Sequence, residues 1–205
     1  MYFTTEVIMK YLVLFTALIL AFCLFCGFMP TKADMAIYES TVRLHVLANS
    51  DSEHDQRVKL FVRDAVLSEL RALMENAESP DEAAQIITEN MDHLRVVCEK
   101  MLADLGEDHS VTLYLSKEKY PTRDYGTFRL PAGIYESLRV EIGEAEGQNW
   151  WCVLYPALCT DVAKTEASFI KTGFTSEQID VLTGGESPKY KIKFKILEIF
   201  GESFS

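Results

Sequence analysis

Residues Thr41 to Ala48, T-V-R-L-H-V-L-A, alternate Val42, Leu44 and Val46 with other side chains at a period of two. Successive side chains of a strand point to opposite faces of a sheet, so this pattern predicts a strand. The next residues, Asn49-Ser50-Asp51-Ser52, are typical of a turn and of helix capping. The domain therefore opens with a strand that leads directly into a helix.

Two amphipathic helices are expected after this strand. The first covers about residues 53–76, with an apolar stripe at helical spacing and acidic residues in its first turn. The second opens at Ser79, which caps it, with Pro80 at the first helical position and Glu82 completing a capping box. It continues as one helix until Gly106 ends it.

After the second predicted helix, apolar residues again recur at every second position. Segments 111–115 and 138–142 alternate apolar and polar residues, which is typical of antiparallel strands. The order of one strand, two helices and further strands predicts an α+β domain with a mainly antiparallel sheet. A last alternating segment, Lys189 to Ile196, indicates a Lys-faced edge strand or a cationic stripe that contacts anionic lipid.

The N-terminus predicts export. Residues Tyr11 to Met29 form an uncharged, almost wholly apolar run between Lys10 and Thr31-Lys32-Ala33. A positive flank, an apolar segment and a small-x-small site are typical of a secretory signal, cleaved here after Ala33. The run also falls within the roughly 17–25 residues that span a membrane, so an uncleaved anchor is the alternative.

Composition excludes several functional classes. The 205 residues include 20 Lys+Arg and 31 Asp+Glu, a net charge of −11 that disfavours nucleic-acid partners. Five cysteines are too few for a disulfide scaffold. The patterning divides the chain into a signal peptide or membrane anchor at 1–33, an α+β domain at 34–159 and an irregular tail at 160–205.

Motifs typical of catalysis, cofactor binding or metal binding are absent from the sequence. It contains no G-x-S-x-G, H-E-x-x-H, G-x-G-x-x-G or P-loop pattern. His45 stands beside Arg43 on the first predicted strand and is interpreted as structural. We therefore expect a protein that is not an enzyme and that has no cofactor and no metal.

The densest group of unusual residues is Gly147 to Cys159, G-Q-N-W-W-C-V-L-Y-P-A-L-C. In an exported protein Cys152 and Cys159 are predicted to form a disulfide, with two buried thiols as the alternative, while Cys98 stays free. Adjacent strand residues point to opposite faces, so one of the two tryptophans should pack against the helices. The other should face outward or line a partner site.

The polar side of the first helix offers a second candidate surface. Asp55 and Lys59 stand at i,i+4, with Arg63 and Asp64 one turn further along. An exposed pair of this kind contributes only about 0.2–0.5 kcal/mol, so a solvated face is the simplest interpretation. A docking surface beside Asn49-Ser50-Asp51 is the alternative.

Several blocks, in the right order, resemble the stage II sporulation protein R family. They are Val42–Ser52, Asp55-Gln56, Val62–Val66, Tyr125-Gly126, Leu130–Tyr135 and Gly147–Pro156 with Cys159. The resemblance covers about Thr41 to Cys159 and the terminal Lys/apolar segment.

This resemblance implies an exported signalling protein of endospore formation. Members of the family pass from the forespore into the intermembrane space, with transient membrane contact through the signal segment. There they activate a membrane-embedded aspartic protease that processes pro-sigma-E in the mother cell. An exported enzyme, such as a cell-wall hydrolase, is the alternative.

Residue types in these blocks suggest which side chains contact the partner. The candidates are Arg43, Asn49, Asp51, Asp55, Lys59, Arg63, Tyr125, Tyr135, Asn149, Trp150 and Trp151.

Overall fold

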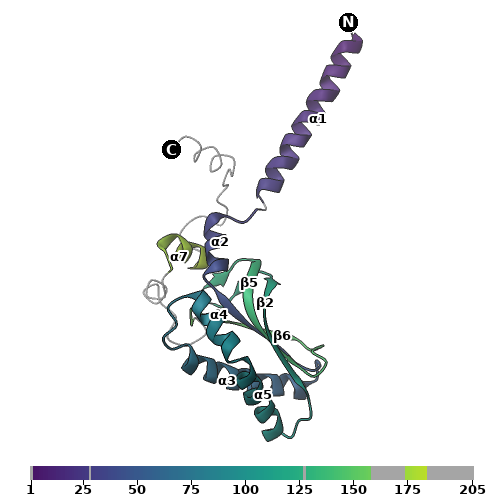
Figure 1. The fold of residues 1–205 in the computed structure, drawn as a ribbon. Coiled ribbons are helices and arrows are strands. Elements are labelled where there is room, and N and C mark those ends of the chain that lie inside the picture. The colour runs from purple at the N-terminus through teal and green to yellow at the C-terminus, as the bar shows by residue number, and fades with distance from the viewer. Residues whose placement is uncertain (1, 28, 127, 158–173, 184–205) are drawn as a thin grey trace. The chain divides into compact units, whose positions relative to one another are not determined.

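The computed structural model describes residues 2–27, 29–126, 128–157 and 174–183 (Figure 1). The chain divides into two compact units, one of which is Lys32–Gly185; the other combines Met1–Thr31 with Glu186–Ser205. The predicted strand Lys189 to Ile196 and the predicted disulfide partner Cys159 lie outside the described residues.

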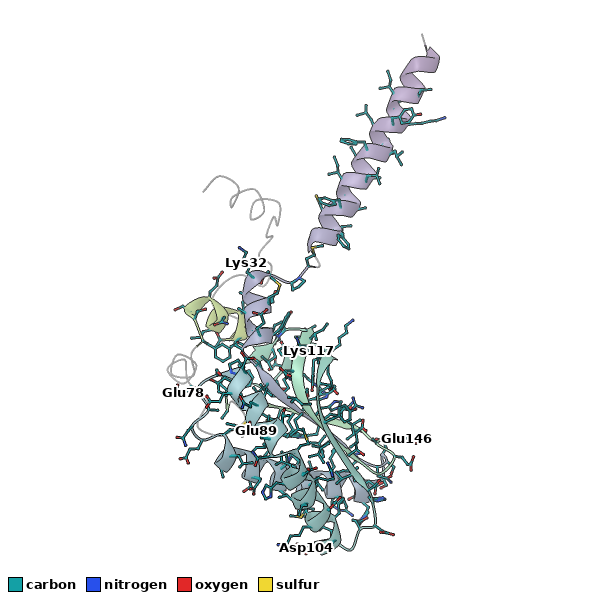
Figure 2. All side chains as sticks on the ribbon, in the orientation of Figure 1. Lys32, Glu78, Glu89, Asp104, Lys117 and Glu146 are labelled. Atoms are coloured by element: carbon teal, nitrogen blue, oxygen red, sulfur yellow. The ribbon has the colours of Figure 1, made fainter. Side chains whose placement is uncertain are left out.

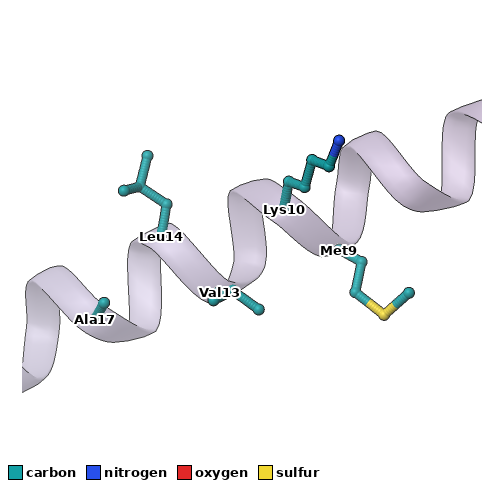
Figure 3. Close-up of a pocket in the computed structure, with 5 residues that line it drawn as sticks. All are labelled: Met9, Lys10, Val13, Leu14 and Ala17. Carbon is teal, nitrogen blue, oxygen red and sulfur yellow. The ribbon is translucent and has the colours of Figure 1, made fainter.

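The first unit contains helix α1, Tyr2–Gly27, which is a single long helix (Figure 1). Its segment Val7–Phe25 is long and apolar enough to cross a membrane, and an N-terminal signal sequence has the same properties. Figure 3 shows a shallow recess on this helix, where Lys10 is the one charged side chain among the five that line it. Since one helix supplies every lining residue, this recess is simply the surface of an apolar helix.

The second unit contains the other helices and strands. They are α2 (Lys32–Glu39), β1 (Val42–Leu47), α3 (Glu53–Leu73), α4 (Pro80–Glu89), α5 (Met91–Asp104), β2 (Val111–Tyr120), β3 (Arg123–Asp124), β4 (Arg129–Leu130), β5 (Gly133–Ile142), β6 (Asn149–Tyr155) and α7 (Ser176–Thr183).

A four-stranded sheet with the order β2-β5-β1-β6 forms the centre of this unit. Strand β1 pairs antiparallel with β6, and β2 pairs antiparallel with β5. The central pair, β1 with β5, is parallel, with Leu44 opposite Leu138. The α+β class and the mainly antiparallel sheet are confirmed, although a parallel pair was not expected. It arises because the chain reverses twice: β2, which follows the helices, runs opposite to β1, and β5 reverses direction again to pair with both strands.

Helices α3, α4 and α5 cover one face of this sheet (Figure 1), and side chains fill the space between the two layers (Figure 2). Apolar residues at alternate positions of β1 and β5 meet the helix stripes in one buried cluster. Its members include Val42, Leu44, Val46, Val62, Val66, Leu70, Leu94, Cys98, Leu102, Leu138, Val140 and Ile142. The apolar residues that alternate along the strands and those that form stripes on the helices therefore pack together in this cluster.

The second predicted helix is two helices. Ser79 caps α4 as expected, since its Oγ accepts a hydrogen bond from the Glu82 N–H at 3.1 Å. The prediction of one continuous helix to Gly106 is wrong, because the helix stops at Asn90 and α5 begins there. The Asn90 side-chain amide donates to the Ile86 carbonyl at 2.8 Å, a local bond that competes with helix continuation.

A second buried cluster joins helices α2 and α7 to the sheet. Ile37 of α2 packs with Tyr135 of β5, and Phe174, Ile179 and Leu182 belong to the same cluster. Helix α7 lies within the segment that the sequence predicts to be irregular, so this part of the segment is helical and packed.

The cysteines differ in their chemical state. Cys152 is disulfide-bonded, and its predicted pairing with Cys159 stays a prediction because Cys159 is not described. Cys98 and Cys23 are free thiols.

We expect the Cys98 thiol to resist alkylation in the folded protein. The side chain is fully buried, and this burial raises the pKa of Cys98 to about 12, so little reactive thiolate is present. Mass spectrometry after iodoacetamide treatment at pH 8 should find Cys98 unlabelled until denaturant is added. Rapid labelling without denaturant would show that α5 opens readily from the sheet.

Candidate functional site

The sheet face opposite α3–α5 carries polar and aromatic side chains. Val42, Leu44 and Val46 of β1 point to the helices, so Arg43 and His45 point to the other face. Neighbouring strands add further side chains there, and we call the set the polar face. It comprises Arg43, His45, Glu118, Tyr120, Tyr135, Ser137, Arg139, Asn149 and Trp151.

Arg43 is fully buried at the centre of this face. Its Nη2 donates to the Tyr125 hydroxyl at 2.6 Å, and its guanidinium carbon lies 3.8 Å from the Tyr120 ring centroid and 5.0 Å from that of Tyr135. Both rings therefore contact the cation through cation–π interactions. Burial raises the pKa of Tyr125, and the Arg43 charge opposes that rise.

His45 links three strands. Its Nδ1 lies 2.9 Å from the Glu118 carboxylate and its Nε2 lies 2.6 Å from the Asn149 Oδ1. Glu118 also accepts from Arg139 Nη1 at 3.1 Å, and Arg139 Nε donates to Glu141 at 2.6 Å. A chain of charged and polar groups therefore crosses the sheet from β6 through β1 and β2 to β5.

Trp151 is half-buried on the polar face. Its ring centroid lies 5.7 Å from that of His45 and 5.8 Å from that of Tyr120, and the Arg123 guanidinium lies 4.0 Å above it. The indole Nε1 is buried without a hydrogen-bond partner.

Trp150 points the other way, as the strand alternation predicts. It packs against the helix-side cluster, where the Arg63 guanidinium lies 4.7 Å from its ring centroid. Both tryptophans are half-buried, so neither is the freely exposed side chain that the sequence allowed for one of them.

A short hairpin, β3–β4, covers part of the polar face. The Tyr125 N–H donates to the Phe128 carbonyl at 2.9 Å, and the two rings stack with centroids 4.8 Å apart. The hairpin thereby presents the Tyr125 hydroxyl to Arg43 and places Arg123 over Trp151. Residues far apart in sequence meet at this point.

Four other predicted contact residues form an internal network at the β1–α3 turn. Asn49 donates to the Asp55 carboxylate at 2.9 Å, and Asp51 accepts from the Gln148 N–H at 2.8 Å. Lys59 is buried and donates to the Gln148 carbonyl at 2.8 Å. These bonds fasten the loop before β6 to the start of α3, so the network has a structural use.

The structure explains why the G-Q-N-W-W block begins with a glycine, Gly147. A Cβ at this position would overlap the backbone carbonyl of Ser50. The loop before β6 can approach the β1–α3 turn this closely only because Gly147 has no side chain.

We expect Asp55→Asn to reduce stability at neutral pH by about 1–3 kcal/mol. Hydrogen bonds from Ser50 and then Asn49 hold the pKa of Asp55 below its usual range. A lowered pKa stabilises the fold above the unfolded-state pKa, and this contribution is lost as pH falls through the folded-state pKa. Urea unfolding should separate the variant from wild type by more at pH 7 than at pH 3. An equal difference at both pH values would exclude a role for the Asp55 charge.

The structure thus sorts the predicted contact residues into three groups. Arg43, Tyr125, Tyr135, Asn149 and Trp151 lie on or against the polar face. The second group is the network at the β1–α3 turn, and the third is the Arg63–Trp150 pair on the helix side. The network consists of Asn49, Asp51, Asp55 and Lys59.

Sequence reasoning missed Glu118, Tyr120 and Arg139, and treated His45 as an isolated structural residue. The available signal was the alternation itself, which puts His45 and Arg139 on the face opposite the apolar core. His45 and Arg139 are opposite each other in the β1–β5 pairing. The sequence could not show this, because the pairing depends on which strands are neighbours in the sheet.

Among the described residues, no cluster of three or more His, Cys, Asp or Glu side chains could hold a metal ion. The polar face is instead built from arginines, aromatic rings and ion pairs. The chain is thus an α+β protein in which a mixed helix-and-sheet domain follows an apolar helix, and that helix has the length and composition of a signal or anchor segment.

Comparison with known proteins identifies the family. The profile of stage II sporulation protein R matches residues 38–164, so the chain belongs to this family. Stage II sporulation protein R of Bacillus subtilis (strain 168) is 35% identical over 125 residues, which cover 61% of this chain and 56% of that protein. The match thus spans little more than half of this relative. No solved structure matches the chain. The family assignment supports a role in sporulation.

Proposed function

We propose that this chain is the exported activator of a membrane-embedded aspartic protease that processes pro-sigma-E in the mother cell. The observation that carries this proposal is the family match over residues 38–164, in a chain whose segment Val7–Phe25 is suited to export. The forespore would export the chain into the intermembrane space, where its domain would contact the protease.

The geometry of the polar face supports a binding role over a catalytic one. Both ring nitrogens of His45 are hydrogen-bonded, to Glu118 and to Asn149. In this arrangement neither nitrogen is available to activate a water molecule or a nucleophile. Aromatic and arginine side chains, which this face supplies, concentrate binding energy at protein interfaces.

Co-expression tests the proposal directly. The full chain, the candidate protease and pro-sigma-E should together give cleaved sigma factor in a host that does not sporulate. A matched chain without residues 1–33 should give none, because it stays in the cytoplasm. Absence of cleavage with the full chain would contradict the proposal. Release of soluble fragments from purified cell wall by the chain alone would instead favour the hydrolase alternative.

We expect the segment up to about Ala33 to be removed on export. Helix α2 begins at Lys32, so cleavage after Ala33 would remove the first two residues of that helix. N-terminal sequencing of the exported protein should therefore begin at Asp34. A mature chain that still starts at Met1 or Met9 would show that α1 is an anchor.

A further inference from the structure

We infer that the polar face contains a site for a carboxylate group of an acidic peptide segment, centred on Arg43 and covered by the β3–β4 hairpin. The inference rests on the proposed function, because it takes the protease as the source of that segment. It assigns the site, the chemistry of its occupant and the part of the fold that controls access.

Hydrogen-bond donors without acceptors gather on this face. In the described part of the chain, buried side-chain atoms without a partner occur at Arg43, Trp151 and Thr41. The Arg43 Nε and Nη1 and the Trp151 Nε1 are all donors, and both side chains flank Tyr120. Buried polar groups are normally paired, so a local excess of donors indicates a missing acceptor.

The charge of Arg43 specifies an anionic acceptor. A guanidinium stays protonated in proteins, and the hydrogen bond that Arg43 makes is to a neutral hydroxyl. The carboxylates nearby are already engaged, Glu118 by His45 and Arg139 and Glu141 by Arg139 and the Tyr114 hydroxyl. A carboxylate would supply both the charge and the acceptor oxygens that Arg43 lacks.

The surroundings favour an acidic peptide at this place. Arg123 of β3 lies over Trp151, so the hairpin itself supplies a second guanidinium, and the charges of both arginines oppose the rise that burial causes in the pKa of Tyr125. The chain as a whole carries a net charge of −11, so an acidic ligand needs a local group of arginines such as this one to offset the repulsion. Aromatic rings beside the arginines provide the apolar contact that a peptide needs and that a lone ion does not use.

The hairpin is suited to act as a cover that opens. Phe128 and Leu130 anchor its second half in the second buried cluster, so the part that can move is the first half, in which Arg123 is exposed and Tyr125 is half-buried. Its polar contact with Arg43 is the Tyr125 hydroxyl, bonded to Nη2 at 2.6 Å. Displacement of Tyr125 would free this donor and let a carboxylate reach the guanidinium.

Fluorescence of Trp151 provides a direct test. The full chain carrying Trp150→Phe, in a non-ionic detergent, has Trp151 as its single tryptophan. We expect a saturable fluorescence change with a capped tetraglutamate peptide, weakened by salt, and none with tetraglutamine. Arg43→Gln should weaken the apparent affinity at least tenfold. Tyr125→Phe should strengthen it severalfold, because it removes the bond that the peptide must displace.

The two variants are expected to change the peptide affinity in opposite directions, so each tests the site independently. If Arg43→Gln does not fold, as judged by circular dichroism, the Tyr125→Phe titration decides alone. Equal responses to tetraglutamine, or unchanged or weaker binding in Tyr125→Phe, would overturn the site. An equal response to inorganic phosphate would overturn the acidic peptide as occupant.

The proposed function can fail separately from this site. Full pro-sigma-E processing with Arg43→Gln would overturn the site as the protease contact and leave the proposed function intact. Absence of processing with wild-type chain would contradict the proposed function, whereas peptide binding measured by fluorescence does not depend on the protease.

Discussion

Replacing Leu138 with alanine is expected to lower the free energy of unfolding by about 2–5 kcal/mol. Leu138 is fully buried in β5, opposite Leu44 of β1 and Leu115 of β2, and belongs to the helix-side core. Truncation there leaves a cavity between three strands and the helices. Since a domain of this size has only about 5–15 kcal/mol in total, the variant should be close to unfolding.

Urea unfolding of the full chain in detergent, followed by circular dichroism, measures this effect. Ile134→Ala is the matched control, because Ile134 lies on the same strand but is 58% exposed. It should change stability by no more than about 0.5 kcal/mol. Comparable losses in the two variants would mean that β5 is not buried against the helices.

Alanine at Trp150 and alanine at Trp151 are each expected to cost about 3 kcal/mol. This is the low end of the range for large aromatic truncations, because each ring is half-buried. Trp150 would lose its packing against the helix-side cluster, and Trp151 its contacts with His45 and Tyr120. The sequence alone allowed one of the two tryptophans to lie free on the surface, and truncating such a side chain would hardly affect stability.

Thermal unfolding of the two tryptophan variants distinguishes these possibilities. A variant that melts with wild type would show that its ring is free of the sheet. Pro-sigma-E processing, measured at a temperature where both variants are folded, should then fall for Trp151→Ala alone. Trp150→Ala is the control here, because its ring lies on the helix side.

Local features of the fold were readable because their causes are local. Ser79 caps α4 through a hydrogen bond with Glu82, three residues along the chain. Strand β1 is predicted by the alternation of apolar residues within its own six positions. The break at Asn90 was missed because the apolar spacing continues across it into α5. A side-chain bond between Asn90 and Ile86 stops the helix without disturbing that spacing.

By itself the sequence determined the apolar N-terminal segment, the α+β class and the two faces of each strand, since these depend on residue type and period. The tertiary structure alone decided the parallel pairing of β1 with β5 and the meeting of Arg43, Tyr125 and Trp151. Alternation specifies which face a side chain occupies, but strand order and hairpin placement specify its neighbours. Arg43 and Tyr125 lie 82 positions apart, and only the packing of the β3–β4 hairpin against the sheet brings them into contact.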